Sequence, residues 1–511
     1  MSDTPVESIE GIVGNVRHCF NSGKTQSVEW RKQQLRALQR MLVEKREALE
    51  QASRDDLHKH ASEFIATEWM VTYNEVSHTL AELDDWVKPQ SAKRNIVVLT
   101  DRTVQVHSQP LGVVLIIGPF NYATQLILLP LIGAIAAGNC CVIKPSELAS
   151  AQASLLQELL PQYLDPEAVQ VVTGGIPQSQ EVLKQRFDKI FFTGGARVGR
   201  IVMEAAAKHL TPVVLELGGK SPVFVADDLS DTELRRAAET IAWARYSNCG
   251  QTCIAPEYVM CSSSMSGRLV GAIRAAVREF YGDSPSESTD YGRMISEGYA
   301  RRVRGLIEEL PESIEVVVLE DESSDNAKHI PPTVVVQPPH ESTLMREEVF
   351  GPVLAVLHVD GVEEAADYVN RGEKPLIAYC FASSNKTVDR FCQRTYSGMF
   401  VGNGCLVNAS VPSLPFGGVG MSGIGGYHGK LSFDTFSHQK AVLMRRLDMA
   451  TDVINRSLLF PPYSLHKTRR LLKIALVSPP MSAAKRRALF ALAFLGVVGV
   501  TAFATHYFMK R

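Results

Sequence analysis

Cysteine is sparse in this chain of 511 residues, and its nine cysteines form no dense framework. Their number is odd, and the chain opens on the polar, acidic stretch MSDTPVESIE instead of a secretory signal. These features argue against a small disulfide-stapled scaffold. We therefore expect reduced thiols in a protein that faces the cytosol.

The chain also lacks a strong excess of charge of either sign. Its formal net charge is −2, with 45% hydrophobic and 21% charged residues, which is an ordinary globular balance. This argues against nucleic acid as a partner, because bulk electrostatic attraction is missing. No repeat typical of a solenoid is visible. The chain is too long to fold around a single hydrophobic core, so two or more compact units are expected.

One long uncharged run departs from this soluble pattern. It reads ALFALAFLGVVGVTAFAT over residues 488–505, with basic residues at 485–487 and at 510–511. A helix needs about 20 apolar residues to cross a bilayer, and the following HYFM extends the run. A buried core helix and an interfacial helix are the alternatives. The basic flanks and the terminal position favour a transmembrane tail anchor over 488–509.

Short apolar runs alternate with helical stretches through the middle of the chain. An amphipathic helix is expected over 29–59 and a hairpin over 94–109. Strands are then expected at 113–117, 141–143, 169–172, 189–192 and 213–217, with helices between them. The order resumes with strands at 222–226 and 257–261 and helices at 231–246 and up to 280. This alternation predicts two α/β units with mostly parallel sheets and a boundary near 218–222.

Two stretches at expected strand ends have features that suit a nucleotide. In FFTGGARVGR, Gly194 and Gly199 follow a strand and open a helix, where backbone N–H groups can approach a phosphate. The spacing is not GxGxxG, and such turns are commonly structural. In VIKPSEL, Lys144 ends a strand and Glu147 follows, so that an amine and a carboxylate could bind ribose hydroxyls. Pro-Ser-Glu is also a common helix start.

Two polar residues follow or end apolar strands. Asn121 in GPFNYA lies just past a strand end, where an amide forms a turn or donates to an oxyanion. Glu216 lies in the apolar strand of VVLELGGKSP. Burial raises the pKa of a carboxyl toward neutrality, as a general base for water requires, and a buried salt bridge is the alternative.

The stretch SNCGQTCIAP holds two cysteines four positions apart, Cys249 and Cys253. A zinc site would need a second Cys or His pair nearby, and redox motifs use CxxC spacing. No metal site is therefore expected. One reactive thiol near a helix start is favoured, with a buried structural cysteine as the alternative.

Taken together, these stretches resemble the aldehyde dehydrogenase superfamily. The ordered set is GPFNYA, KPSE, FTGGARVG, LELGGKSP, NCGQTCIAP, EEVFGPVL and PFGGVGMSGIGGYHGKLSFDTFSH. The last stretch looks like class 3, the branch that contains the membrane-anchored fatty aldehyde dehydrogenases. The resemblance covers about residues 30–446.

The resemblance implies a role for each of these residues. Cys253 would attack the aldehyde carbon, Asn121 and the Cys253 N–H would hold the oxyanion, and Glu216 would activate the water that hydrolyses the thioester. Glu348 and Phe350 match residues that position the nicotinamide ribose and ring.

The cofactor implied by the resemblance is NAD. Lys144 and Glu147 match its adenosine-ribose contacts, and Gly194 and Gly199 flank its pyrophosphate. Class 3 members can also accept NADP, but a carboxylate at Glu147 should disfavour a 2′-phosphate. The family often has Trp and Pro around the Asn-Tyr pair, where this chain has Phe120 and Ala123, a difference that concerns the tunnel wall.

The resemblance also implies a domain plan: NAD-binding domain, 1–93 and 110–219; catalytic domain, 220–427; bridging element for a homodimer, 94–109 and 428–446. A basic linker with a possible gatekeeper helix would follow at 447–487, and the anchor at 488–509. The anchor suits medium- and long-chain aliphatic aldehydes, which partition into lipid. We expect the catalytic body on the cytosolic side of the endoplasmic reticulum, with the outer mitochondrial membrane or peroxisome as alternatives.

Two other functions stay open from the sequence. An acylating dehydrogenase would pass the thioester to coenzyme A, although a base at Glu216 favours hydrolysis. A tail-anchored scaffold without activity would not need Cys253, Glu216 and Asn121 together.

Overall fold

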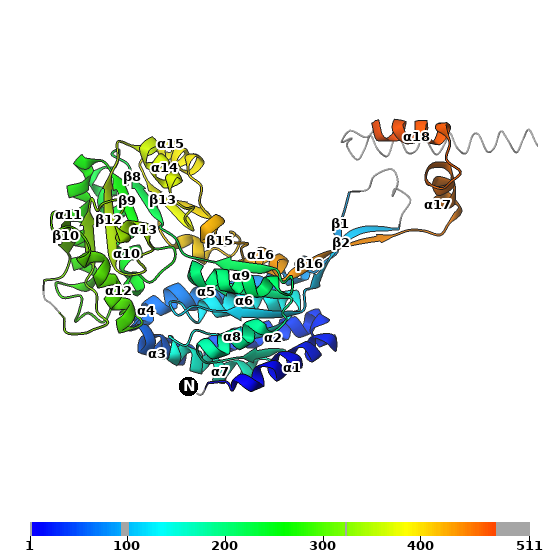
Figure 1. The fold of residues 1–511 in the computed structure, drawn as a ribbon, viewed down its shortest axis with the longest axis horizontal. Helices are drawn as coiled ribbons and strands as arrows, with labels where there is room; N and C mark the ends of the chain where they lie inside the picture. The colour runs from blue at the N-terminus through cyan, green and yellow to red at the C-terminus, as the bar shows by residue number, and fades with distance from the viewer. Residues whose placement is uncertain (1–2, 94–101, 322–323, 477–511) are drawn as a thin grey trace, which may run out of the picture. The chain divides into compact units, whose positions relative to one another are not determined.

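The computed structural model describes residues 3–93, 102–321 and 324–476. Two compact units divide the chain: the first comprises residues 1–88 and 108–439, and the second comprises 89–107 and 440–511. The described parts of each unit are shown in Figure 1. The first unit holds two large sheets, and the candidate site lies within it.

The first sheet of this unit has six strands in the order β15-β7-β6-β3-β4-β5. All neighbouring pairs with recorded register are parallel except β15 against β7. The strands are apolar, and β3 and β4 are buried over nearly their whole length. Their bounds are β3 Val113–Ile117, β4 Cys140–Lys144, β5 Val169–Val171, β6 Lys189–Thr193, β7 Val213–Glu216 and β15 Gly423–Ile424.

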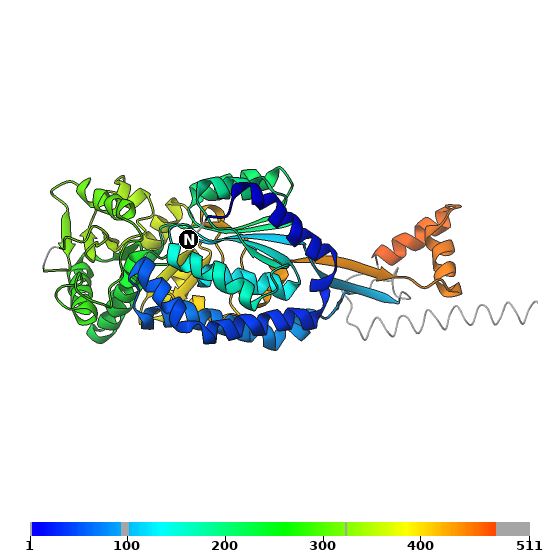
Figure 2. The same ribbon diagram turned by 90° about the horizontal axis from the view of Figure 1, so that it is seen from below.

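Helices cover both faces of this sheet (Figure 2). Helix α8 contacts both α1 and α9, and α1 and α9 pack on the strands of the sheet. Helices α6 and α7 contact an outer layer that includes α2, α3 and α5. Every residue of α6 is buried, because it lies between the sheet and this outer layer. The bounds are α1 Ile9–Asn21, α2 Val28–Glu44, α3 Arg46–Leu57, α4 Ala61–Phe64, α5 Met70–Trp86, α6 Gln125–Ala137, α7 Ser150–Tyr163, α8 Ile176–Lys184, α9 Ala196–Ala207 and α16 Gly429–Thr435.

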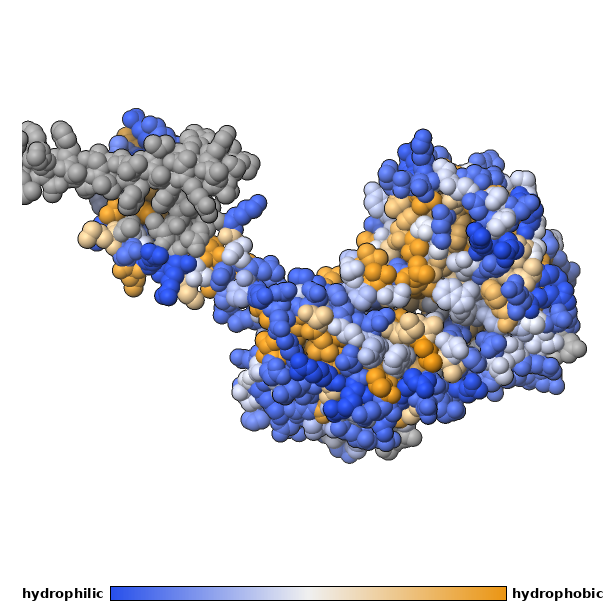
Figure 3. Space-filling model, turned by 180° about the vertical axis from the view of Figure 1, so that it is seen from behind, coloured by the Kyte–Doolittle hydropathy of each residue, from blue (hydrophilic) through white to orange (hydrophobic). Residues whose placement is uncertain are grey.

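The second sheet of the unit has seven strands in the order β10-β11-β12-β9-β8-β13-β14. Only β10 pairs antiparallel with its neighbour. The strands are β8 Pro222–Val225, β9 Tyr258–Cys261, β10 Glu315–Val318, β11 Thr333–Val336, β12 Val353–His358, β13 Ile377–Phe381 and β14 Met399–Gly402. The helices are α10 Asp231–Tyr246, α11 Ser263–Tyr281, α12 Glu297–Glu308, α13 Thr343–Arg346, α14 Val362–Arg371 and α15 Asn385–Arg394. Seen from behind, the first unit is hollowed between its two lobes, and apolar surface lines the hollow (Figure 3).

The second unit contains most of a three-stranded sheet in the order β1-β2-β16. Its strands are β1 Gln90–Ser91, β2 Thr103–Pro110 and β16 Ser437–Met444. Two helices follow, α17 Met449–Ile454 and α18 Leu465–Leu476. The second arm of the expected hairpin is β2, and its first arm, 94–100, lies outside the described residues. Helix α18 spans the stretch in which the possible gatekeeper helix was expected.

The α/β class with parallel sheets is confirmed, and two local expectations were wrong. The single helix expected over 29–59 is two helices, because Lys45 leaves helical geometry between α2 and α3 (φ −110°, ψ 13°). The helix expected to open at Pro145 begins at Ser150, after a turn.

The expected membrane anchor over 488–509 lies outside the described residues. Among the helices that the structure describes, none combines the length and apolar character needed to span a bilayer.

Candidate active site

Cys253 lies in a turn that leads into β9, within the first unit. The expectation that it lies near a helix start was wrong, because the 3-10 turn Ser247–Gly250 ends before it. Asn248 and Cys249 in that turn have positive φ values of 52° and 53°, which bend the chain sharply. The Cys253 side chain is partly exposed, whereas Cys249 is fully buried. Of the two cysteines, Cys253 is therefore the one that a substrate can reach.

The thiol of Cys253 is strongly biased toward its protonated form. Burial, and then the nearby carboxylates of Glu348 and Glu216, raise its pKa to about 12. The backbone N–H groups of Cys253 and Ile254 bond the sulfur and act in the opposite direction. A nucleophilic thiolate at this position requires that its proton be removed as the sulfur attacks.

Asn121 lies in the loop between β3 and α6 and is 2% exposed. Its side-chain Nδ2 donates to the carbonyl oxygen of Gln251, 2.9 Å away. The next residue, Tyr122, shares a hydrogen bond of 2.7 Å with Thr252. These two contacts hold the loop after β3 directly against the residues that precede Cys253.

Glu216 is the last residue of β7 and is 3% exposed. Neither carboxyl oxygen has a hydrogen-bond partner in the described structure, and burial raises its pKa well above the usual value. The alternative of a buried salt bridge is therefore wrong. Its charge also contributes to the raised pKa of Cys253, so the two groups lie within electrostatic reach. A raised pKa makes the ionised carboxylate of Glu216 a stronger base, so that form is suited to accept a proton beside the thiol.

Glu348 and Phe350 lie in the loop between α13 and β12. A carboxylate oxygen of Glu348 accepts the N–H of Gly219 at 3.3 Å, and a Cβ on Gly218 would overlap that carboxylate. Burial and the nearby Glu257 raise the pKa of Glu348 to about 8. Phe350 has a φ of 49° and packs edge-on against Phe120, with ring centroids 5.9 Å apart.

The candidate cofactor residues lie at the carboxyl ends of the first sheet. Lys144 ends β4, is 2% exposed and donates to the carbonyl oxygen of Pro145, with Glu147 at 3.8 Å. Gly194 follows β6 and donates its N–H to the carbonyl oxygen of Glu216. A Cβ on Gly194 would meet the ring of Phe192, and Gly199 in the first turn of α9 is similarly close to Leu217. The structure thus brings these four residues to the same edge as Asn121 and Glu216.

The chain matches the model of the aldehyde dehydrogenase family over residues 2–442. It belongs to the aldehyde dehydrogenase family. It is 44% identical over 467 residues to aldehyde dehydrogenase family 3 member B1 of Rattus norvegicus, covering 91% of this chain and 97% of the relative. It is also 44% identical over 439 residues to family 3 member A2 of Macaca fascicularis, covering 86% and 89%.

A third relative is the dimeric, NADP-preferring aldehyde dehydrogenase of Rattus norvegicus, 44% identical over 448 residues, with 86% of this chain and 96% of the relative covered. The substrate-bound structure of Staphylococcus aureus AldH superposes with a TM-score of 0.85 at 34% identity, covering 91% of this chain and 99% of that one. The protein is thus an NAD(P)-dependent aldehyde dehydrogenase that resembles the class 3 members.

Tyr427 of the YHGK stretch lies within electrostatic reach of Glu216 and Cys253 of this aldehyde dehydrogenase, and His428 packs against its ring, although sequence reasoning gave neither residue a role. Tyr427 is 1% exposed, and after burial the charges of Glu216 and Cys253 raise its pKa further. His428 stacks on Phe416 with neither ring nitrogen hydrogen-bonded in the described structure, and burial lowers its pKa to about 4. The signal that could have found them was the position of the stretch among the family motifs.

Sequence reasoning also assigned no role to Glu257 of this aldehyde dehydrogenase. It forms buried ion pairs with Lys220 (2.9 Å) and Arg245 (2.8 Å) and accepts the N–H of Val349 at 2.9 Å. Burial alone would raise its pKa, but the two cations outweigh it and lower the pKa to about 2. This charged carboxylate fixes the loop that carries Glu348 and Phe350.

The surroundings of Cys249 argue against a role as a second active thiol. Its sulfur contacts the Tyr291 hydroxyl at 3.8 Å, and burial raises its pKa to about 12. All nine cysteines of this aldehyde dehydrogenase lie among the described residues and are free. Within those residues no group of three or more His, Cys, Asp or Glu side chains is placed to hold a metal ion.

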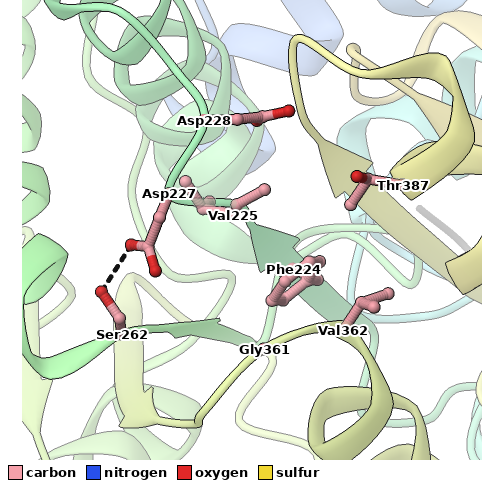
Figure 4. A pocket seen from close by; sticks show the side chains of 9 residues that line it. Phe224, Val225, Asp227, Asp228, Ser262, Gly361, Val362 and Thr387 are labelled. Carbon is pink, nitrogen blue, oxygen red and sulfur yellow. Dashed lines mark hydrogen bonds between the residues drawn. The ribbon is translucent and has the colours of Figure 1, made fainter.

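A separate pocket lies at the other end of β9 from Cys253 (Figure 4). Ser262 follows β9 there and donates to Asp227, which follows β8, at 2.5 Å. The remaining lining residues are Phe224, Val225, Ala226, Asp228, Gly361, Val362 and Thr387. None of the predicted site residues of the aldehyde dehydrogenase contributes to it.

The charge of Glu348 should control the reactivity of Cys253 in the absence of cofactor. Below pH 8 Glu348 is neutral, and above pH 8 its negative charge opposes thiolate formation. At pH 9 iodoacetamide should therefore alkylate Cys253 faster in Glu348→Gln than in wild type, by up to about tenfold for each unit by which the Cys253 pKa falls. At pH 6.5 the two proteins should react at the same rate. Peptide mass spectrometry at Cys253 measures the rate. Glu347→Gln, whose carboxylate pairs with Arg302 at the surface, is the matched control, and equal rates for Glu348→Gln and wild type at pH 9 would refute the expectation.

Proposed function

We propose that this enzyme oxidises medium- and long-chain aliphatic aldehydes to carboxylic acids with NAD, using Cys253 as the nucleophile. The observation that carries the proposal is the meeting of three side chains. Asn121 is tied to the Cys253 loop through Gln251, and Glu216 lies within electrostatic reach of the sulfur. A thiol, an amide donor and an unpaired carboxyl are the groups that thioester chemistry on an aldehyde requires.

The cofactor candidates fit NAD by their chemistry. Lys144 and Glu147 offer an amine and a carboxylate for ribose hydroxyls, and Gly194 and Gly199 leave the β6–α9 turn free of side chains. A carboxylate at Glu147 would repel a 2′-phosphate, so NAD is proposed over NADP. Glu348 and Phe350 would face the nicotinamide end. When bound, NAD supplies the acceptor for the hydride that the aldehyde carbon loses.

The residues of the chain carry the other steps. The Cys253 sulfur adds to the aldehyde carbon as its thiol proton passes to solvent water. The product is a thiohemiacetal whose negatively charged oxygen accepts from the side-chain amide of Asn121 and the Cys253 N–H. Loss of hydride leaves a thioester on Cys253. The Glu216 carboxylate takes a proton from water, which attacks the thioester carbon, and the sulfur leaves and takes that proton from Glu216 to regenerate the thiol. Burial raises the pKa of Glu216, which makes its carboxylate a stronger base than an exposed one.

The preference for long chains rests on the proposed anchor over 488–509. Long-chain aldehydes partition into lipid because each buried CH₂ is worth about 0.8 kcal/mol. An enzyme held at the bilayer surface meets them where they concentrate. The four Lys and Arg residues of α18, Lys467, Arg469, Arg470 and Lys473, would suit anionic headgroups, and α18 is the proposed gatekeeper helix. We propose the endoplasmic reticulum, with the outer mitochondrial membrane or peroxisome as alternatives for fluorescence localisation to decide.

Turnover of an aldehyde series tests the chemistry. NADH formation should occur from acetaldehyde to hexadecanal, with kcat/KM rising by up to about fourfold per CH₂ until the chain fills its site, and with NAD favoured over NADP. Cys253→Ala should form neither NADH nor acid. Acid production by that variant would remove the nucleophile assignment, and acyl-CoA formation when coenzyme A is supplied would replace hydrolysis by acyl transfer.

Two deletions separate the anchor from α18. Removal of 488–511 should lower hexadecanal turnover in vesicles and leave propanal turnover unchanged, because propanal is water-soluble. Removal of 471–511 also truncates α18 and should alter chain-length preference even in detergent. Unchanged hexadecanal turnover in vesicles by both proteins would contradict the anchor and the gatekeeper helix.

A homodimer is proposed through β2 and β16. Strand β16 is the edge of its three-stranded sheet, and most of its residues are exposed, which leaves backbone groups able to pair with another chain. Light scattering of protein lacking 488–511 should give twice the chain mass. A monomer mass that persists at micromolar concentration would exclude this arrangement.

A further inference from the structure

A buried ion pair that the proposed mechanism does not use lies under the Asn121 loop. Lys59, between α3 and α4, donates to a carboxylate oxygen of Glu68 at 2.7 Å, and both side chains are 0% exposed. Removing two charges from water is costly, and apolar residues of similar volume often replace such pairs without loss of stability. The pair therefore calls for a role beyond stability.

The pair contacts the loop 121–125 at three points. Lys59 Nζ donates to the backbone carbonyl oxygen of Asn121 at 3.2 Å, and it lies 4.1 Å from the ring centroid of Tyr122. The other carboxylate oxygen of Glu68 accepts the N–H of Gln125, the first residue of α6, at 3.4 Å. The Lys59 ammonium and the Glu68 carboxylate thus hydrogen-bond to the two ends of the turn that contains Asn121.

The same carbonyl oxygen links the pair to the cysteine loop. Asn248 Nδ2 donates to the Asn121 carbonyl at 2.8 Å, so one oxygen accepts from Lys59 and from the loop that carries Cys253. The Asn121 side chain in turn commits one N–H to Gln251. Because the backbone of Asn121 is fixed from one side and one of its amide protons from the other, the second Nδ2–H of Asn121 has a defined direction.

We propose that Lys59 and Glu68 are positioning residues that hold Asn121 in place as the oxyanion donor. This inference rests on the proposed function, because it assigns Asn121 that role. Neither residue touches substrate or cofactor in this scheme. They act by fixing the donor before charge develops on the oxygen, since a donor that must reorganise during the reaction stabilises the transition state less.

The test compares a neutral, nearly isosteric pair with loss of the donor itself. Lys59→Met/Glu68→Gln removes both charges of the pair together and with them the donation to the Asn121 carbonyl. Its kcat/KM for hexanal should fall about tenfold, less than the loss for Asn121→Ala, which should reach about a hundredfold. NAD affinity, measured by fluorescence titration, should stay within twofold of wild type, and all rates are divided by the NAD-binding sites titrated.

Combination of the variants separates positioning from a general structural effect. In the Asn121→Ala background the Lys59→Met/Glu68→Gln change should cause no further loss, because its effect passes through Asn121. Full additivity of the two losses would overturn the inference. If the double variant does not fold, Glu68→Gln alone takes its place in the same cycle, with the same non-additivity expected.

Arg31→Met is the matched control for a lost buried cation. Arg31 is 7% exposed and donates to the carbonyl oxygens of Thr25, Gln26 and Ala136, none of which belongs to the candidate site. It should lower the melting temperature while kcat/KM per titrated site stays unchanged. Wild-type activity in the Lys59→Met/Glu68→Gln variant, with activity lost in Asn121→Ala, would refute the positioning role alone. Full activity in Asn121→Ala would refute both the oxyanion assignment and the positioning role.

Discussion

Parallel pairing of β3, β4, β6 and β7 is the constraint on which the rest of the site depends. Parallel strands that point the same way bring all their carboxyl ends to one edge of the sheet. Asn121 and Gly194 follow two of these strands, and Lys144 and Glu216 end two others. Residues far apart in the sequence therefore meet without any one loop having to supply more than a few of them. The second sheet then adds Cys253 just before β9.

The site also depends on giving three buried glutamates different surroundings. Glu257 lies between Lys220 and Arg245, which keep it charged, and it uses that charge to hold backbone N–H groups. Glu348 has one backbone N–H and a like charge nearby, so its pKa rises. The carboxyl group of Glu216 has no hydrogen-bond partner in the described structure, and burial raises its pKa well above the usual value. One residue type thus supplies a fixed anchor and two groups that can be neutral.

The strands and the residues at their ends could be predicted from the sequence, because both leave local signals. Apolar runs followed by Gly, Asn or Lys placed Asn121, Lys144 and Glu216 at strand ends, where the structure has them. The break at Lys45 left no such signal, since the apolar periodicity continues through it. Burial of Glu216 was predictable, but its lack of partners depends on side chains from other segments.

The positioning groups were beyond sequence reasoning for a physical reason. Lys59 acts on Asn121 across 62 positions, and Glu257 binds Val349 across 92. A lone lysine after a helix or a glutamate before a strand reads as a solvated surface residue, and only tertiary packing shows that each is buried. Such residues escape motif analysis because the groups that they position are backbone atoms, which every sequence contains.

Mutual repulsion between Cys253 and Glu216 gives the proposed cycle an order. Because a charge on Glu216 raises the pKa of Cys253, a thiolate at Cys253 must by linkage raise the pKa of Glu216. The two groups therefore resist being charged together, so the site avoids holding a free thiolate and a carboxylate before substrate binds. Once the sulfur is bonded to the acyl carbon it can no longer be charged, and that obstacle to ionisation of Glu216 disappears. The carboxylate that activates water is then easiest to form at the thioester stage, which is the step that needs it.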